Sequence, residues 1–310
     1  MTETVSPEIK EGGPRYKILV IQANPGASPE LKIAERMFGR AGEEPNIADY
    51  PHLEVTYLRA PKVKEKPDKL ERELAADEGF KPEEFFPNNP EAYQGIIITG
   101  SPFATYPRAL RRENGEIQPY LTRWKRELIA YIRAAVDHKM PVLGICFGAQ
   151  MLAEALGGET ERMKKGEEEI KEVGLTIVWK VPGASGDPIM GRLPEAFVVA
   201  ENHGDCISRL PEGAVLLAEN EYGIQGIRVD DEKGSPIAWG FQFHPERPPE
   251  EALKRLEKDP EHSRLLKEKL RQQGLSEEEI NQQISGLAVG YSPVVSQIFS
   301  AFLDFVRGRI

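Results

Sequence analysis

The chain contains 310 residues, of which 40% are hydrophobic, and it carries a formal net charge of −10 at pH 7. A chain of this length and composition can bury one large core or two small ones, which excludes intrinsic disorder as the default state. The negative charge argues against a general nucleic-acid binder, because such proteins need a cationic face for the phosphate backbone. Only two cysteines are present, too few for a disulfide framework or for a structural zinc site with four ligands.

The sequence contains no segment typical of secretion or membrane insertion. Residues 1–10 lack the apolar core of a signal peptide, and no stretch approaches the roughly 18 apolar residues of a membrane span. We therefore expect a soluble, cytoplasmic protein with no membrane partner and no nucleic-acid partner. No group of His, Cys or Asp has the spacing of metal ligands, so neither a metal nor a cofactor is expected.

The first half of the chain alternates between short strands and helices. Continuous apolar runs, which suit strands covered on both faces, predict strands at 17–22, 95–99 and 141–145. Alternation of Val55 and Tyr57 with Glu54 and Thr56 predicts a further strand at 53–58. Apolar residues recurring every three or four positions predict a helix from about 119 to 138, and a second helix is predicted at 147–156. Strand, turn and helix in this order predict a mostly parallel sheet with helices on both faces.

The second half is predicted to consist of strands at short spacing that extend the sheet as hairpins. These strands are expected at 173–179, 196–200, 214–218, 224–229 and 237–243. A last helix, at about 293–306, is expected to dock on the core. The sequence thus predicts a single three-layer α/β domain over residues 1–310, with a mostly parallel central sheet, helices on both faces and an antiparallel extension.

Two charged insertions interrupt this pattern, at about 60–90 and at about 247–292. The first is rich in Lys, Glu and Pro, and the second contains a charged helical segment at 247–283 with few large apolar residues. Each has two interpretations. It is either a solvated surface insertion, or a lid or partner-binding segment near a functional site.

Cys146 is the strongest candidate for a reactive residue. It lies in Gly-Ile-Cys-Phe-Gly-Ala-Gln (144–150), between a predicted buried strand and the start of a predicted helix. The turn between these elements needs small neighbours, which Gly144 and Gly148 provide. The helix N-terminus favours a thiolate over a thiol and offers N–H groups to a developing oxyanion. A lone buried cysteine is usually inert, but this placement is typical of a nucleophile, as in the nucleophile elbow of α/β-hydrolases.

A thiol nucleophile needs a base, and His203 and His244 are the two candidates. The other three histidines lie in surface-like or insertion segments. His244 follows an apolar strand in Phe-Gln-Phe-His-Pro-Glu (241–246), so its ring is expected where open α/β sheets place their sites. Glu246 can orient the imidazole and stabilise its cation. His-x-Glu alone is a weak signal, and it gains force only from the cysteine motif.

Together these segments resemble the class I glutamine amidotransferase family. Residues 144–150, followed by Met-Leu-Ala-Glu-Ala-Leu-Gly-Gly, look like its nucleophile motif, and residues 241–246 look like its His-Pro-Glu motif. Ile-Ile-Thr-Gly-Ser-Pro (97–102) resembles its oxyanion loop, and Asn-His-Gly-Asp (202–205) resembles its Ser-His-Gly-Asp segment. The resemblance runs from about residue 17 to residue 246 and includes the final helix. It implies the family's flavodoxin-like fold.

The resemblance implies a role for each matching residue. Cys146 would attack the side-chain amide carbon of glutamine, and His244, oriented by Glu246, would protonate the departing ammonia and then activate water. An oxyanion hole is implied at backbone N–H groups of Gly100, Ser101 and Phe147. The amino-acid end of the substrate would be bound by Gln150, and the same pocket would be lined by Asn202 and His203. The alternatives are a helix-surface role for Gln150 and a satisfied turn histidine at His203.

Three functions remain open from the sequence. The first is a glutaminase that supplies ammonia to a separate synthetase, because the chain has no Walker-like phosphate loop for ATP-dependent acceptor chemistry. The second is a hydrolase of γ-glutamyl peptides or amides without ammonia channelling. In its favour, Gly100-Ser101-Pro102 replaces the Gly-Gly-Pro common in synthetase-linked glutaminases and is more similar to stand-alone members. The third is a catalytically idle binding module that retains the fold.

Overall fold

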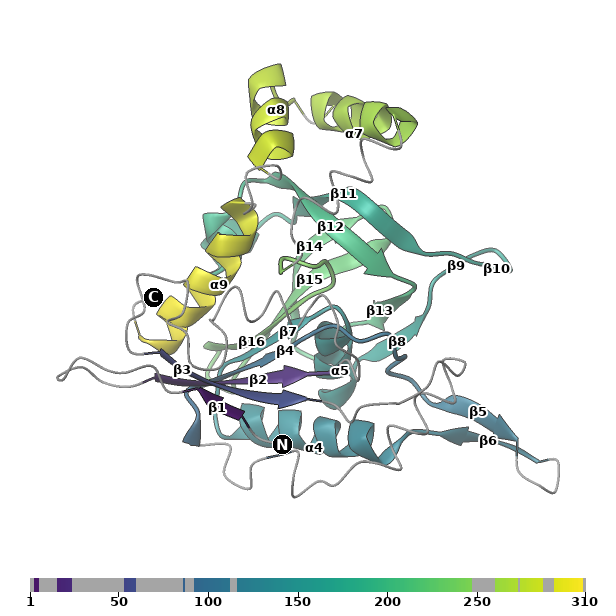
Figure 1. Ribbon diagram of the computed structural model, residues 1–310, viewed down its shortest axis with the longest axis vertical. Helices are drawn as coiled ribbons and strands as arrows, with labels where there is room; N and C mark the ends of the chain where they lie inside the picture. Colours follow the sequence, from purple (N-terminus) through teal and green to yellow (C-terminus); the bar gives the residue numbers. More distant parts are fainter. Residues whose placement is uncertain are drawn as a thin grey trace.

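The computed structural model describes residues 3–5, 16–23, 53–59, 86, 92–111, 116–246, 260–272, 274–286 and 293–308. Its centre is a ten-stranded mixed sheet with the strand order β1-β3-β2-β4-β7-β16-β15-β14-β11-β12 (Figure 1). In chain order, the bounds of these strands are β1 Glu3–Val5, β2 Tyr16–Gln22, β3 Leu53–Arg59, β4 Gly95–Ile98, β7 Val142–Ile145, β11 Glu172–Lys180, β12 Ala196–His203, β14 Val215–Asn220, β15 Gly223–Asp230 and β16 Pro236–Phe241.

The sheet has a parallel half and an antiparallel half. Strands β3, β2, β4, β7 and β16 run parallel to one another. Strands β15, β14, β11 and β12 continue the sheet as antiparallel neighbours, and β1 is antiparallel to β3 at the opposite edge. The predicted α/β fold is therefore confirmed, and its antiparallel part is as extensive as its parallel part. Because β4, β7 and β16 are parallel neighbours, their carboxyl ends meet at one edge of the sheet.

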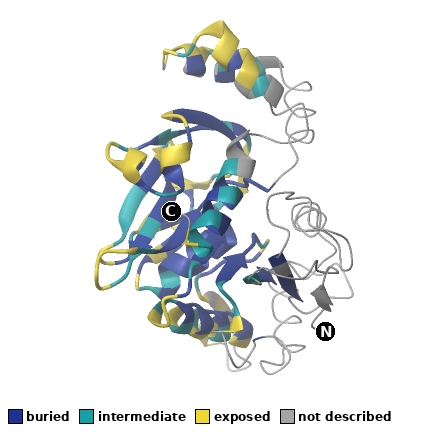
Figure 2. Ribbon diagram, turned by 90° about the vertical axis from the view of Figure 1, so that its left-hand side faces the viewer, coloured by how far each residue is buried: buried dark blue, intermediate teal, exposed yellow. Residues whose placement is uncertain are grey.

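Helices cover both faces of the parallel half. Successive residues of a strand point to opposite faces, so Leu19 and Val20 of β2 lie in two different cores. Leu19 packs in the core with α4 (Arg123–Asp137) and α5 (Phe147–Ala155). Val20 packs in the core with α9 (Pro293–Val306). Strands β4 and β7 are buried along their whole length, as the dark blue interior of Figure 2 illustrates, which explains why they are apolar without alternation.

Apart from two helices of the second insertion, the remaining described elements are short. They form three two-stranded sheets and two 3-10 helices: β5 Arg108–Arg111 with β6 Ile117–Tyr120, β8 Glu159–Arg162 with β13 Asp205–Arg209, β9 Lys164–Lys165 with β10 Glu168–Glu169, η2 Ala184–Gly186 and η3 Met190–Arg192. No helix in the described ranges is long and apolar enough to cross a membrane.

The predicted elements match the structure to within three residues at each end, with one exception. The helix predicted from about 119 begins only at Arg123, which is a correction to the prediction. Pro119 and Tyr120 instead belong to β6 and pair with Ala109 and Arg108 of β5. Pairing with the preceding strand of a hairpin overrides the helical pattern here, and the periodicity within 119–138 does not include that partner.

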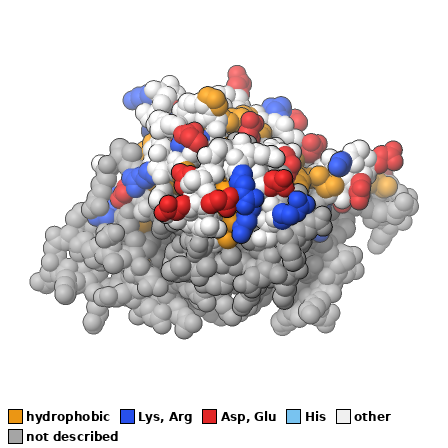
Figure 3. All heavy atoms as spheres, turned by 90° about the horizontal axis from the view of Figure 1, so that it is seen from above, with side chains coloured by type: hydrophobic (Ala, Val, Ile, Leu, Met, Phe, Trp, Pro, Cys, Tyr) orange, Lys and Arg blue, Asp and Glu red, His pale blue; other side chains and the backbone are white. Residues whose placement is uncertain are grey.

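Part of the second insertion forms a cap on the antiparallel half of the sheet. Helices α7 (Pro260–Gln272) and α8 (Glu277–Gly286) contribute Leu270 and Ile280 to a separate apolar core that also contains Leu175 of β11. Seen from this end of the molecule, acidic and basic side chains are interspersed on the surface (Figure 3). The described part of the insertion is therefore not purely solvated, because one face of each helix is buried against β11 and β12.

The first insertion, at about 60–90, lies outside the described residues except for Phe86. Phe86 is buried, and its ring stacks on Tyr131 of α4 with the two centroids 5.0 Å apart. At least this residue of the insertion packs in the main core. The organisation of residues 1–310 as a single domain stays a prediction.

Candidate active site

Cys146 lies at the turn between β7 and α5, where it is the N-cap of the helix. Its φ of 51° and ψ of −107° are an unusual backbone conformation for a residue that has a side chain. Its backbone N–H donates a hydrogen bond to the carbonyl of Phe241, 2.7 Å away at the end of β16. Strain that the surrounding structure maintains in this way is typical of functional residues.

Gly144 and Gly148 allow the nucleophile turn to pack closely against its neighbours. A Cβ added to Gly144 would lie 2.5 Å from the carbonyl carbon and oxygen of Gly148. One added to Gly148 would lie 2.2 Å from the carbonyl oxygen of Ile98 in β4. Both distances are far below van der Waals contact, and the atoms concerned are backbone atoms that cannot rotate away. The predicted need for small neighbours around Cys146 is confirmed.

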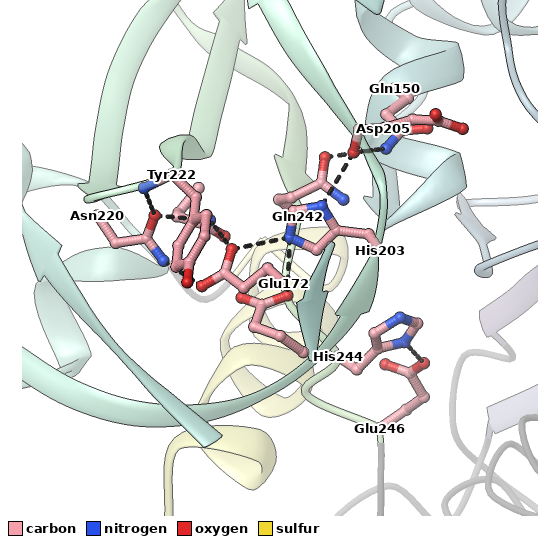
Figure 4. Close-up of polar contacts among 11 residues, drawn as sticks. Gln150, Glu172, His203, Asp205, Asn220, Tyr222, Gln242, His244 and Glu246 are labelled. Atoms are coloured by element: carbon pink, nitrogen blue, oxygen red, sulfur yellow. Dashed lines mark hydrogen bonds and ion pairs between the residues drawn. The ribbon is translucent and has the colours of Figure 1, made fainter. Parts of the chain in front are cut away.

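His244 follows β16 and is held at two points. Its backbone N–H donates to the carbonyl of Ala200 in β12 at 2.9 Å, and its Nδ1 lies 2.6 Å from Glu246 Oε1 (Figure 4). The side chains of His244 and Glu246 are 3% and 6% exposed. Within the described part of the chain, Nε2 of His244 has no hydrogen-bond partner. With Nδ1–H donated to the carboxylate, the Nε2 lone pair is the group that can act as a base.

Gly100 marks the point where the nucleophile and the base meet. A Cβ added to Gly100 would lie 3.0 Å from His244 Cε1 and 3.6 Å from Cys146 Cβ, so both side chains border the same point in space. The three residues follow β4, β16 and β7, which are adjacent parallel strands. The structure therefore brings Cys146, His244 and Glu246 together at the carboxyl edge of the sheet, although about a hundred residues separate the first two in the sequence.

The residues expected to form an oxyanion hole border the same turn. Phe147 is the first residue of α5, and the first intrahelical hydrogen bond runs from the N–H of Gln150 to the carbonyl of Cys146 at 3.0 Å. The N–H of Phe147 therefore precedes the intrahelical bonds and is not needed by the helix. Ser101 follows Gly100 and is half-buried, and its Oγ accepts a hydrogen bond from the N–H of Phe103 at 3.3 Å.

Gln150 is buried in the core of the site. It is 2% exposed, and its Nε2 donates to the carbonyl of Asp205 at 2.8 Å and to Gln242 Oε1 at 3.1 Å. The alternative of a helix-surface residue is therefore wrong. Gln150 lies one helical turn beyond Cys146, and Gln242 lies two residues before His244, so this contact joins the two catalytic segments (Figure 4).

Asn202 and His203 point to opposite faces of β12. The strand continues to His203 rather than ending at residue 200 as predicted, and successive strand residues alternate in direction. Asn202 is exposed, whereas His203 is 6% exposed. The expectation that both side chains line one pocket is wrong, because it assumed a turn where the sheet continues.

His203 lies in a buried cluster with two glutamates. Its Nε2 is 3.0 Å from Glu172 Oε2 and 3.2 Å from Glu201 Oε2, and its Nδ1 is 2.9 Å from the carbonyl oxygen of Asp205. Burial by itself lowers the pKa of His203, but hydrogen bonds to Glu172 and Glu201 outweigh burial and raise the pKa from 6.5 to about 10. His203 is therefore an imidazolium at neutral pH, not a base.

The same cluster has the spacing of a metal site. One ligand atom from each of Glu172, Glu201 and His203 lies within 4.8 Å of the others. Sequence spacing did not predict this cluster, because pairing of β11 with β12 brings Glu172 opposite His203 from 31 residues away. The only local signal was Glu201-x-His203, two residues that share one face of a strand. In the structure, Nε2 of His203 faces both carboxylates, so a proton on Nε2 can occupy the position between them.

The fold and these side chains define an α/β protein with a buried cysteine, histidine and glutamate at the carboxyl ends of adjacent parallel strands. Residues 80–259 match the sequence model of the family described as Glutamine amidotransferase class-I. This match covers more than half of the chain, and the chain belongs to that family. The resemblance stated from the motifs is confirmed.

Two kinds of curated relative are similar to this chain. The glutamine-hydrolyzing GMP synthase of Thermotoga maritima is 34% identical over 151 residues, which cover 49% of this chain and 24% of that protein. A gamma-glutamyl-L-1-hydroxyisopropylamide hydrolase from a Pseudomonas species is 32% identical over 155 residues, which cover 50% of this chain and 48% of that protein. The matched region is therefore less than half the length of either relative.

Solved structures share the fold over nearly the whole chain. A glutamine amidotransferase from Thermotoga maritima superimposes with a TM-score of 0.55 at 20% identity, covering 95% of this chain and 99% of that one. A glutamine amido transferase from Methylobacillus flagellatus superimposes with a TM-score of 0.53 at 20% identity, covering 94% of each chain. At this identity the similarity establishes the architecture.

Proposed function

We propose that this chain hydrolyses the γ-glutamyl amide bond of glutamine, releasing glutamate and ammonia, with Cys146 as the nucleophile. The observation that carries this proposal is the shared border at Gly100, where Cys146 Cβ and the His244 ring approach the same point. The 2.6 Å contact between His244 and Glu246 supplies the orienting acid. A nucleophile, a base and an acid in this relation are the requirements of acyl transfer through a covalent intermediate.

In the first half of the reaction, His244 Nε2 accepts the thiol proton and the Cys146 sulfur attacks the amide carbon. A carbon–sulfur bond forms and the carbonyl oxygen becomes an oxyanion. His244 then donates the proton to the amide nitrogen, the carbon–nitrogen bond breaks, and ammonia leaves a γ-glutamyl thioester on Cys146. Glu246 stabilises the imidazolium that exists between these two proton transfers.

In the second half, His244 takes a proton from water as the water oxygen attacks the thioester carbon. The carbon–sulfur bond then breaks, His244 returns its proton to the sulfur so that the thiol of Cys146 is restored, and glutamate is released. Both oxyanions would be held by the N–H of Phe147 and by N–H groups of the Gly100-Ser101 turn. One such donor contributes roughly 3 to 4 kcal/mol where it has been removed from other enzymes.

The destination of the ammonia distinguishes two versions of this function. We favour delivery to a separate synthetase, because the GMP synthase relatives are named as glutamine-hydrolyzing. The alternative is hydrolysis of a γ-glutamyl amide without ammonia delivery, which is favoured by the relative that hydrolyses gamma-glutamyl-L-1-hydroxyisopropylamide. Ser101 also favours this alternative, because Gly100-Ser101-Pro102 is more similar to the oxyanion loop of stand-alone members than to the Gly-Gly-Pro of synthetase-linked glutaminases.

The test is covalent labelling by a glutamine-analogue diazoketone, followed by mapping of the modified residue. We expect a single adduct on Cys146 and none in C146A, while C206S serves as the matched control and labels like the wild type. Absence of an adduct on Cys146 in the wild type would refute the proposal. Turnover of free glutamine compared with γ-glutamyl alkylamides then separates the two versions, since a channelling glutaminase prefers glutamine and an amide hydrolase prefers the alkylamide.

A further inference from the structure

Asp205 contacts several segments that surround the candidate active site. Its carbonyl oxygen faces Gln150 Nε2 at 2.8 Å and His203 Nδ1 at 2.9 Å. Its carboxylate accepts a hydrogen bond from the hydroxyl of Tyr106 at 3.0 Å and pairs with Arg162 at 3.0 Å. Asp205 is 5% exposed, so these contacts are made away from water.

The partners of Asp205 come from parts of the chain that are far apart in sequence. Gln150 lies on α5, one turn beyond the nucleophile, and Tyr106 lies in the loop that begins at Gly100. His203 ends β12, and Arg162 ends β8. Asp205 therefore links the nucleophile helix, the oxyanion loop and the buried glutamate cluster, although it does not itself border Gly100.

With both glutamates ionised, the contacts of His203 favour two protons on its ring. Nδ1 faces the carbonyl oxygen of Asp205, which can only accept a hydrogen bond. Nε2 faces the carboxylates of Glu172 and Glu201, which also accept. A neutral ring would place a nitrogen lone pair against one of these oxygens and leave a buried group unsatisfied. The pKa of His203, raised from 6.5 to about 10, agrees with a doubly protonated ring.

The cluster is held from outside β12 as well. Glu172 Oε1 accepts from Asn220 Nδ2 at 2.6 Å, and Glu172 Oε2 accepts from Gln225 Nε2 at 3.0 Å. Gln225 also accepts, through its backbone carbonyl, the N–H of Gln242 at 2.9 Å. Three strands of the antiparallel half, β11, β14 and β15, thus fix the position of the imidazolium through the contacts of Glu172.

Among the residues linked to His203 and Asp205, Gln150 is the one expected to contact the substrate. Its Nε2 carries two hydrogens, and the two contacts to Asp205 and Gln242 use both. Rotation of the amide would lose both bonds, so the amide is fixed with its oxygen as the group that remains to accept a hydrogen bond. A donor on the amino-acid end of a γ-glutamyl substrate, the α-ammonium group, is the complementary partner.

We propose that His203, held by Glu172 and Glu201, is a positioning residue for γ-glutamyl recognition. It acts by fixing the Asp205 carbonyl, which in turn orients the Gln150 amide. This inference rests on the proposed function, since it assigns the orientation of Gln150 to binding of the same substrate. It assigns no proton transfer to His203, whose two ring protons are both engaged.

Two substitutions separate the two nitrogens of His203. The amide nitrogen of Asn lies close to the position of Nδ1, so H203N can keep the bond to the Asp205 carbonyl. The amide nitrogen of Gln lies close to the position of Nε2, so H203Q keeps a donor toward the glutamates and loses the contact with Asp205. Both variants remove the positive charge, and they differ in the contact that the proposal makes responsible for recognition.

The readouts are Cys146 alkylation by iodoacetamide, which needs no γ-glutamyl recognition, and alkylation by the glutamine-analogue diazoketone, which does. In H203Q we expect the diazoketone rate to fall about tenfold or more and KM for glutamine to rise by a similar factor, as loss of one substrate hydrogen bond predicts. In H203N we expect changes of about threefold or less. The iodoacetamide rate should match the wild type in both variants.

Three results would overturn the inference. The first is a wild-type diazoketone rate in H203Q. The second is an equal loss with both reagents in both variants, which would indicate a purely structural role. The third is a wild-type protein that reacts with iodoacetamide but not with the diazoketone, which would remove the proposed function and this inference together.

A measurement on the wild-type protein covers the case in which the variants do not fold. Nitrogen-15 NMR of the five histidines distinguishes an imidazolium from a neutral ring. We expect one histidine to remain doubly protonated at pH 8.5, where unperturbed histidines are neutral. A His203 ring without a proton on Nδ1 at that pH would overturn the inference without any substitution.

Discussion

Replacement of Gly100 by alanine tests the geometry of the site with a single methyl group. The new Cβ would lie 3.0 Å from His244 Cε1, so the ring must move by a few tenths of an ångström. The ring has little room, because its side chain is 3% exposed and held 2.6 Å from Glu246. We expect kcat for amide hydrolysis to fall about 10-fold to 100-fold, as misplacement of a catalytic group predicts. Overpacking should lower the free energy of unfolding by about 1–3 kcal/mol.

Gly95→Ala is the matched control for this substitution. Gly95 begins β4, the strand that Gly100 follows, and a Cβ there would lie 3.0 Å from Ile18 Cδ1 and from Val306 Cγ2. The steric conflict is similar, but it is remote from the catalytic side chains. Steady-state kinetics and chemical denaturation of both variants should therefore show a comparable loss of stability and a loss of kcat only in G100A. Wild-type kcat in a folded G100A protein would refute the reasoning.

Three further predictions follow from burial and charge. Because its pKa is raised from 6.5 to about 10, His203 contributes stability that is fully present below about pH 6.5 and lost as the pH rises through about 10. Thermal denaturation should show a steeper loss between pH 7 and 10 in the wild type than in H203N, and parallel curves would contradict this. Leu270→Ala should lower the free energy of unfolding by about 2–5 kcal/mol in chemical denaturation, because the side chain of Leu270 in α7 is fully buried. The rate of Cys146 alkylation should stay unchanged. Unchanged stability would mean that α7 does not pack as described. Burial, with the charges of Glu161 and Asp205, raises the pKa of Cys206 to about 11, so at pH 7.5 iodoacetamide should modify Cys146 well before Cys206, as peptide mapping can show. Faster modification of Cys206 would contradict this.

The parallel half of the fold could be predicted from sequence because its signals are local. Apolar runs such as 17–22 and 95–99 are buried on both faces, and this leaves a continuous pattern that needs no partner to be recognised. The turn at Cys146 was equally predictable, since a Cβ added to Gly144 or Gly148 would lie 2.5 or 2.2 Å from backbone atoms and no larger residue fits. Local signals also predicted that Cys146 follows β7 directly and that His244 and Glu246 follow β16.

The features that sequence reasoning missed depend on the pairing of strands. Pro119 lies in β6 because β5 pairs with it, and a helical period cannot exclude that partner. Glu172 reaches His203 only through the register of β11 with β12, so the buried cluster had no spacing to recognise. The side chain of Asn202 was misassigned because β12 runs three residues beyond the predicted strand end. In each case tertiary pairing decided what the local pattern left open.

Alkylation of Cys146 by iodoacetamide at pH 6.5 tests most directly whether Cys146 and His244 work as a pair. Nucleophilicity of a cysteine at this pH depends on a neighbouring base that keeps the sulfur as thiolate. We predict that the rate falls about tenfold or more in H244A, and less in E246Q, while C206S matches the wild type. Equal rates in the wild type and in folded H244A would contradict the assignment of Cys146 and His244 to one catalytic site.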